Sequence, residues 1–236
     1  NWGNFNNAYP YIAIPGHPIA MFYGHIFDGV YQYTDFDKVG ESYILKDGVP
    51  NNGNAREKIQ PGDIKFKDIN RDGVVNDYDL TIIGNPNPKH IGGFGNNFQY
   101  KNFDLNVFFQ WSYGGDVLNA NRIEFEGGDP NARTSLNMFA SFANRWTPEN
   151  QTNELYRIGG QGPAVYSSRT IEDGSFLRLK TVSLGYRLPN AWLKKINIKS
   201  LRVYASAQNL ITWTRYSGPD PEVSTRPTAV SYTHLR

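Results

Sequence analysis

The residues whose types and spacing could perform chemistry lie between Asp68 and Asp79. Oxygen-bearing side chains recur there at the spacing of a calcium loop, and Gly73 allows the turn that brings them together. Calcium takes about six to eight hard oxygen ligands. We therefore predict a structural Ca²⁺, although hydrogen bonds from the same side chains could hold the turn without metal. The predicted ligands are Asp68, Asn70, Asp72, Val74 through its carbonyl group, Asn76 and Asp79.

Enzyme chemistry finds no support in the sequence. The chain has no cysteine, and it contains no HExxH, GxSxG or Walker motif. Its four histidines are scattered, and we expect that the protein is not an enzyme. With 24 basic and 22 acidic residues and no long basic run, we also expect no nucleic-acid partner.

The main secondary-structure elements of the chain are expected to be long β-strands. Large apolar residues alternate with polar ones from Phe103 to Tyr113, and Lys101-Asn102 separates this run from a similar one that starts at Gly92. An 11-residue strand is about 36 Å long, enough to cross a tilted bilayer core. We predict that one face of the strand contacts lipid, through Phe103, Leu105, Val107, Phe109 and Trp111.

A second hairpin is predicted over 176–188 and 201–213, with a slip in the alternation over 176–180 that indicates a bulge. The connection 189–200 has room for one helical turn, and an earlier strand is expected over 19–32. Long connections, at 33–90, at 114–173 and after 213, then alternate with short ones at 101–102 and 189–200. This places all long connections on one side of an up-and-down sheet, as in transmembrane β-barrels.

Four aromatic residues fall in or beside a long predicted outer loop. Their rings could stack on a substrate, or they could be interface and packing residues. The candidate substrate-binding residues are Tyr113, Trp146, Tyr156 and Tyr166.

Several blocks in the same order resemble the SusC-like (RagA-like) TonB-dependent outer-membrane transporters. They are the segments 16–18, 22–32, 61–73, 83–88, 174–186 and 208–222. The resemblance implies an all-β fold, an antiparallel up-and-down transmembrane β-barrel segment: a partial barrel of about five to seven strands with long extracellular loops. Residues 1–223 would form the C-terminal part of that barrel. Residues 224–236 would be a tail of uncertain origin.

The same resemblance implies a function and partners. The chain would be a fragment of an importer of oligosaccharides or peptides, located in a Gram-negative outer membrane. It would contact outer-membrane lipids and a SusD-like surface lipoprotein, and it would depend on the TonB complex through a plug that has no counterpart in this chain. No cofactor other than Ca²⁺ is implied.

Two alternatives from other classes remain open at this point. A soluble, calcium-dependent, carbohydrate-binding β-sandwich would also use loop aromatics, and it would bury the apolar strand face beneath a second sheet. A structural or adhesion module could be built around the loop, which resembles that of dockerin modules; its short helix would span 78–83.

Overall fold

The computed structural model describes residues 10–127, 137–162, 166–194 and 197–222. The chain divides into two compact units. The first lies within Asn1–Pro86 and Leu118–Glu172, and the second within Asn87–Val117 and Asp173–Val223. No helix among the described residues is both long and apolar enough to cross a membrane.

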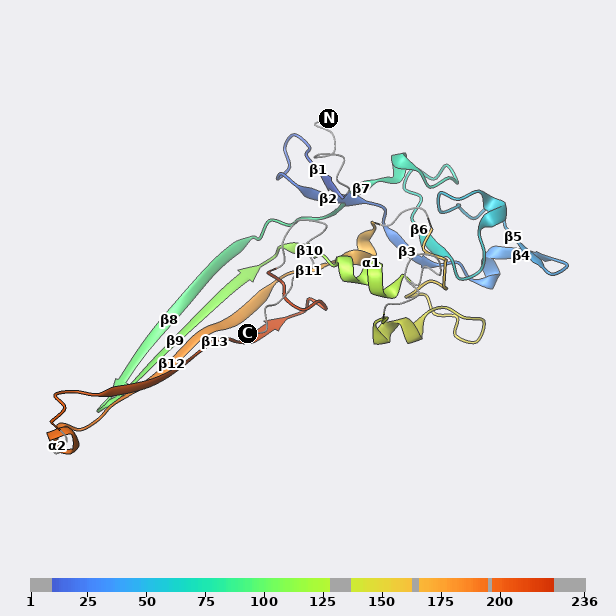
Figure 1. Ribbon diagram of the computed structural model, residues 1–236. Coiled ribbons are helices and arrows are strands. Elements are labelled where there is room, and N and C mark those ends of the chain that lie inside the picture. The colour runs from blue at the N-terminus through green and yellow to red at the C-terminus, as the bar shows by residue number, and fades with distance from the viewer. Residues whose placement is uncertain (1–9, 128–136, 163–165, 195–196, 223–236) are drawn as a thin grey trace. The chain divides into compact units, whose positions relative to one another are not determined.

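The second unit is a long four-stranded antiparallel sheet (Figure 1). Its strand order is β13-β12-β9-β8, and every neighbouring pair is antiparallel. This confirms both predicted hairpins and the up-and-down arrangement. Among the described residues the sheet ends at β8 and β13 and does not close. The strands are β8 (His90–Tyr100), β9 (Phe103–Tyr113), β12 (Phe176–Arg187) and β13 (Arg202–Thr214).

The turns and irregularities of this sheet follow the sequence closely. Tyr100 pairs with Phe103 across a two-residue turn in which Lys101 has a φ of 53°. The register shifts between Leu179 and Thr181, where the alternation slips, so the predicted bulge is confirmed. The connection between β12 and β13 contains α2 (Asn190–Leu193), a single helical turn as expected.

The first unit consists of short strands and turns from the part of the chain before β8 and from the connection between β9 and β12. β2 (Met21–Gly24) lies between β1 (Tyr11–Ile12) and β7 (Thr81–Gly84). Two-stranded pairs are formed by β3 (Phe27–Val30) with β6 (Ile64–Phe66), β4 (Phe36–Val39) with β5 (Ser42–Leu45), and β10 (Asp116–Leu118) with β11 (Ile171–Asp173). The helical segments are α1 (Ala120–Glu126) and the 3₁₀ turns η2 (Tyr33–Asp35), η3 (Arg56–Lys58), η4 (Asp77–Asp79), η5 (Ala140–Asn144) and η6 (Ser168–Thr170).

Two hydrophobic clusters hold the first unit together. The larger one brings residues from the part of the chain before β8 and from the connection between β9 and β12 into one core, so both segments carry packed structure of their own. It comprises Val30, Ile64, Phe66, Val75, Trp146, Leu155 and Tyr156. The smaller cluster comprises Tyr31, Phe36, Leu45 and Ile59.

The single strand predicted over 19–32 is wrong. Two short strands form instead, because β2 pairs with β1 and β7 whereas β3 pairs with β6. Glycines break the run: Gly29 has a φ of +94°, and Gly24 lies so close to Tyr166 that a Cβ there would be 2.9 Å from the carbonyl oxygen.

The helix predicted over 78–83 is also wrong. Only the 3₁₀ turn η4 forms at this point, and the chain continues directly into β7, where Ile82 pairs with Tyr23. Thr81, Ile82 and Ile83 are β-branched residues that favour a strand when a partner strand is present.

Gly62 provides a test of how tightly the first unit is packed. Its φ is +90°, and a Cβ at this position would lie 2.4 Å from Cε3 of Trp146. We expect Gly62→Ala to cost about 2–4 kcal/mol, because backbone strain and overpacking add. Gly40→Ala is the matched control, since Gly40 has a φ of +63° and open space around it. Its expected cost is about 1 kcal/mol.

The measurement is hydrogen-exchange protection of the β3 and β6 amides in a full-length protein that carries this chain. An equal loss of protection in both variants would mean that the contact with Trp146 contributes nothing.

Candidate functional site: two faces of the long sheet

The strand register gathers large apolar side chains from all four long strands on one side of the sheet. Directly opposed residues share a face, so the partners of Phe103, Leu105 and Phe109 extend that face in both directions. We call it the apolar face. It comprises Phe94, Phe98, Tyr100, Phe103, Leu105, Val107, Phe109, Trp111, Leu177, Leu179, Val182, Leu184, Tyr186, Val203, Ile211 and Trp213.

No side chain of the apolar face is buried by the described part of the chain. Phe103, Leu184 and Trp213 are each 49% exposed, and the others are exposed or half-buried. Neighbouring rings contact one another within the face, as Phe94 and Phe109 do at a centroid distance of 4.8 Å. The predicted lipid-facing residues therefore lie together. The second sheet that a β-sandwich requires is not formed by the described residues.

The opposite side of the sheet, which we call the polar face, carries hydrophilic groups. Asp104 on β9 and Arg202 on β13 form an ion pair across the intervening strand β12. Gly185 makes room for the pair, because a Cβ there would lie 2.4 Å from Nη2 of Arg202. Both partners are 39% exposed, so in bulk water the pair would add little stability. Asn106 donates a hydrogen bond to Asn97 on the same face.

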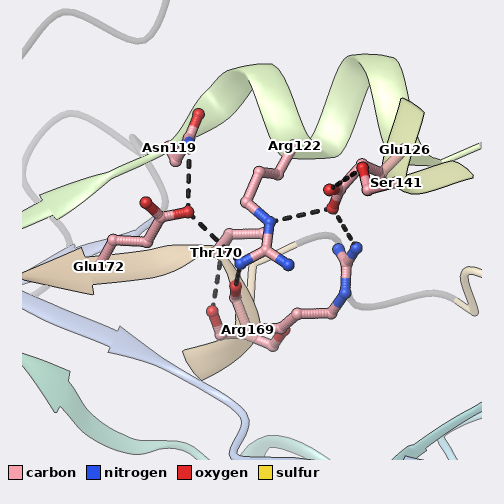
Figure 2. A network of polar contacts seen from close by, with 8 residues as sticks. Asn119, Arg122, Glu126, Ser141, Arg169, Thr170 and Glu172 are labelled. Carbon is pink, nitrogen blue, oxygen red and sulfur yellow. Dashed lines mark hydrogen bonds and ion pairs between the residues drawn. The ribbon is translucent and has the colours of Figure 1, made fainter. Parts of the chain in front are cut away.

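A buried network of charged residues ties together segments of the first unit (Figure 2). Glu126, at the end of α1, accepts hydrogen bonds from Arg122 Nε (2.9 Å) and Ser141 Oγ (2.7 Å), and its carboxylate also pairs with Arg169 of η6. Arg122 Nη1 donates to the Arg169 carbonyl oxygen (2.9 Å) and lies 3.3 Å from Glu172. The network thus joins α1, η5, η6 and β11.

Burial makes these charges depend on one another. Glu126 and Arg169 are only 5% and 9% exposed, and removing Glu126 would leave Arg169 buried without its counter-charge, whereas Glu126 would keep Arg122 as a partner if Arg169 were removed. Burial acts to raise the pKa of Glu126, but hydrogen bonds from Ser141 and Arg122 and the charge of Arg169 outweigh it. The net pKa lies below its ordinary value.

The Asp-rich loop is closed by its own hydrogen bonds. The two carboxylate oxygens of Asp68 accept from the backbone N–H groups of Arg71 (2.6 Å) and Gly73 (2.8 Å). Asp79 is fully buried, and its oxygens accept from the N–H groups of Ile69 (2.8 Å) and Asn76 (2.9 Å). A carboxylate oxygen has about two acceptor sites, so the single N–H bond to each Asp68 oxygen and to Asp79 Oδ2 leaves capacity for a cation. Asp79 Oδ1 also accepts from the N–H group of Asn70 (3.4 Å), and both of its sites are used.

The side chains of the remaining predicted ligands also form hydrogen bonds within the loop. Asn70 and Asp72 accept from the N–H groups of Asp72 and Val74, and Asn76 donates to the Val74 carbonyl oxygen. Within the described ranges, no three His, Cys, Asp or Glu side chains converge as a metal-binding group would. The oxygen chemistry of the loop fits calcium, and calcium binding stays a prediction.

The four candidate substrate-binding aromatics occupy different environments. Trp146 and Tyr156 are 5% and 3% exposed in the larger core, and Trp146 Nε1 donates to Gln32 (3.0 Å). We therefore reassign these two residues from ligand stacking to packing. Tyr113 is 53% exposed and stacks on His90 at 5.1 Å, and Tyr166 is half-buried. The prediction for Tyr113 and Tyr166 stays untested.

The buried network escaped sequence reasoning. Glu126 and Arg169 are 43 positions apart, and isolated charged residues in a long connection predict a solvated surface. The one local signal is the i, i+4 spacing of Arg122 and Glu126, which favours a helical pair but says nothing of burial.

Comparison with known proteins shows that the chain is similar to part of the TonB-dependent receptors. No protein-family model matches it. TonB-dependent receptor P3 of Formosa agariphila is 37% identical over 224 residues, which are 95% of this chain and 20% of that protein. SusC, a TonB-dependent receptor of Bacteroides thetaiotaomicron, is 32% identical over 170 residues, 71% of this chain and 16% of SusC.

Solved structures agree with these relatives. The RagAB peptide importer in its closed-closed state superposes on 90% of this chain and 22% of its own, with a TM-score of 0.61 and 26% identity. The chain thus spans about a fifth of the length of the P3 receptor and of the matched RagAB chain.

The depressed pKa of Glu126 generates a pH prediction. Its stabilising contribution is fully present above the ordinary Glu pKa of about 4.3, and is lost as the pH falls through the lower pKa of the folded state. Protection factors of the α1 and η6 amides, corrected for intrinsic exchange, should therefore fall only in acid.

Glu126→Gln should cost about 3 kcal/mol at neutral pH and remove this acid dependence, because it leaves Arg169 buried without a counter-charge. Glu154→Gln, at an exposed position, is the control and should change neither the protection at neutral pH nor its acid dependence. Unchanged protection in Glu126→Gln would contradict the role of the network.

Proposed function

The chain is homologous to a segment of the TonB-dependent receptors of the SusC and RagA type, and we propose that it forms barrel wall and outer loops of a nutrient importer in a Gram-negative outer membrane. In this role it makes and breaks no covalent bond. Its long strands separate hydrocarbon from an aqueous interior, and the packed structure in its long connections forms part of the outer chamber.

The uncovered apolar face carries this proposal. Large apolar residues on four adjacent strands need an apolar phase, because burying each one is worth about 1.5–3 kcal/mol. The described residues supply no second layer, and lipid would supply that phase. The opposite face, with Asp104, Asn106 and Arg202, suits contact with water.

The descriptions of the relatives support a proposal for the partners and the cargo. RagAB is described as a peptide importer, and SusC and the Formosa proteins as TonB-dependent receptors. We propose an oligosaccharide or a peptide as cargo, a SusD-like surface lipoprotein as partner, and the TonB complex as the source of energy through a plug.

Spin labels on adjacent residues test the two faces. Val107→Cys and Asn106→Cys place labels on opposite faces of one strand, and the chain has no other cysteine. In a full-length protein reconstituted in lipid, the label at 107 should collide with oxygen, which dissolves in hydrocarbon. The label at 106 should collide with a water-soluble nickel chelate.

Leu184→Cys and Ser183→Cys repeat the comparison on β12, because Leu184 pairs with Leu105 and Ser183 with Asn106. Labels at 107 and 184 that are shielded from both reagents would favour the sandwich and refute the barrel wall.

We further propose that the loop from Asp68 to Asp79 binds Ca²⁺ in a structural role. Its side chains would supply hard oxygen ligands and lock the connection between β6 and β7. No transport step depends on the ion.

Terbium luminescence tests the calcium proposal. Tyr78 is 83% exposed beside Asp79 and should sensitise a Tb³⁺ ion that Ca²⁺ displaces. Asp68→Asn should weaken this affinity at least about tenfold, since it removes one ligand charge. Asp77→Asn, in the same loop but outside the predicted ligand set, should not. Equal titrations of both variants would show that hydrogen bonds alone close the loop.

A further inference from the structure

The segment that follows β13 covers one end of the polar face. Residues 215–222, which we call the strap, include Tyr216, whose side chain is only 6% exposed. Phe176 and Arg178 on β12 are buried, whereas the other described residues of the polar face, apart from Gly185, are exposed or half-buried. The strap therefore lies at the end of the polar face where the side chains of β12 are buried.

A single arginine joins the strap to the sheet. Arg178 Nη2 lies 2.6 Å from Asp220 Oδ1, and Arg178 Nη1 lies 2.6 Å from Glu222 Oε2. The arginine side chain is 4% exposed, and its guanidinium carbon lies 5.1 Å from the centre of the Phe176 ring. Two strap carboxylates thus converge on one buried cation.

A second cation on β12 completes the charge balance, and a residue of the neighbouring strand β9 adds a hydrogen bond. Gln110 of β9 donates to Glu222 (3.3 Å), and Lys180 of β12 lies 3.8 Å from the same carboxylate. Arg178 and Lys180 therefore match the two negative charges of Asp220 and Glu222. A balanced cluster is stable, but a buried charge left without its partner is costly.

We infer that Arg178 is an anchor that holds the strap folded over the polar face, so that breaking the Arg178 pairs releases the strap and opens that end of the face. The strap has the composition of a turn, Ser217-Gly218-Pro219-Asp220-Pro221, rather than of a strand that could add to the sheet. Its attachment therefore depends on side chains, and above all on charge-assisted hydrogen bonds.

The anchor has a consequence for transport that rests on the proposed function. If the polar face lines the importer's lumen, an anchored strap narrows the lumen at one end and a released strap widens it. Docking of the strap itself does not depend on that orientation, so the two proposals can fail separately.

Chymotrypsin cleaves after tyrosine and can therefore report strap docking. The Tyr216 side chain is 6% exposed in the docked strap, and we expect it to become accessible when the strap is released. In the full-length protein, Arg178→Gln should accelerate cleavage after Tyr216 at least about tenfold relative to cleavage after the exposed Tyr78. Arg202→Gln breaks an exposed ion pair on the same face and should leave the rate unchanged.

Heat-modifiable migration in gels monitors assembly of each variant. If Arg178→Gln does not assemble, Glu222→Gln and Asp220→Asn decide, since each leaves Arg178 one carboxylate; about threefold faster cleavage is expected. Wild-type cleavage rates in the assembled variants, or an equal rise in Arg202→Gln, would overturn the inference. The spin-label result at Val107 is independent of all these outcomes.

Discussion

A wide apolar face without a protein layer over it is the constraint on which the rest of this molecule depends. Four long strands present aromatic and aliphatic side chains in register on one side of the sheet, and the described residues leave all of them exposed or half-buried. Such a surface is stable only where another apolar phase meets it. That need separates the chain from sandwiches, which supply their own second sheet.

The first unit is held together by other interactions than the long sheet. Its strands are short, and its order comes from two hydrophobic clusters and a buried set of ion pairs that joins segments far apart in sequence. Buried pairs of this kind add little net stability relative to apolar packing, but they are intolerant of the loss of one partner. They can therefore specify one arrangement of the segments that they join.

How much could be predicted from the sequence differs between the two units, for a physical reason. Both long hairpins, their turns and the bulge can be predicted, because period-two alternation runs through all of β9 and through β12 after its bulge, and such alternation is a strong local signal. The structure of segment 19–32 could not be predicted, because its two halves pair with different strands, β2 with β7 and β3 with β6. The helix predicted after Asp79 does not form, because the residues that follow pair with β2. Trp146 and Tyr156 carry no mark that distinguishes a core ring from a ligand-stacking one.

The bulge at Lys180 has a bearing on how related chains should be aligned. Before it, odd-numbered residues of β12 such as Leu177 and Leu179 lie on the apolar face; after it, even-numbered residues such as Val182 and Leu184 do. β13 contains two additional residues opposite the bulge, so its odd-numbered residues lie on the apolar face both before and after it. A homologue that lacks the residue at 180 would have to exchange the two faces of half a strand. In an alignment, gaps near residue 180 should therefore be placed so that the alternation of apolar and polar residues is matched, rather than so that identical residues are matched.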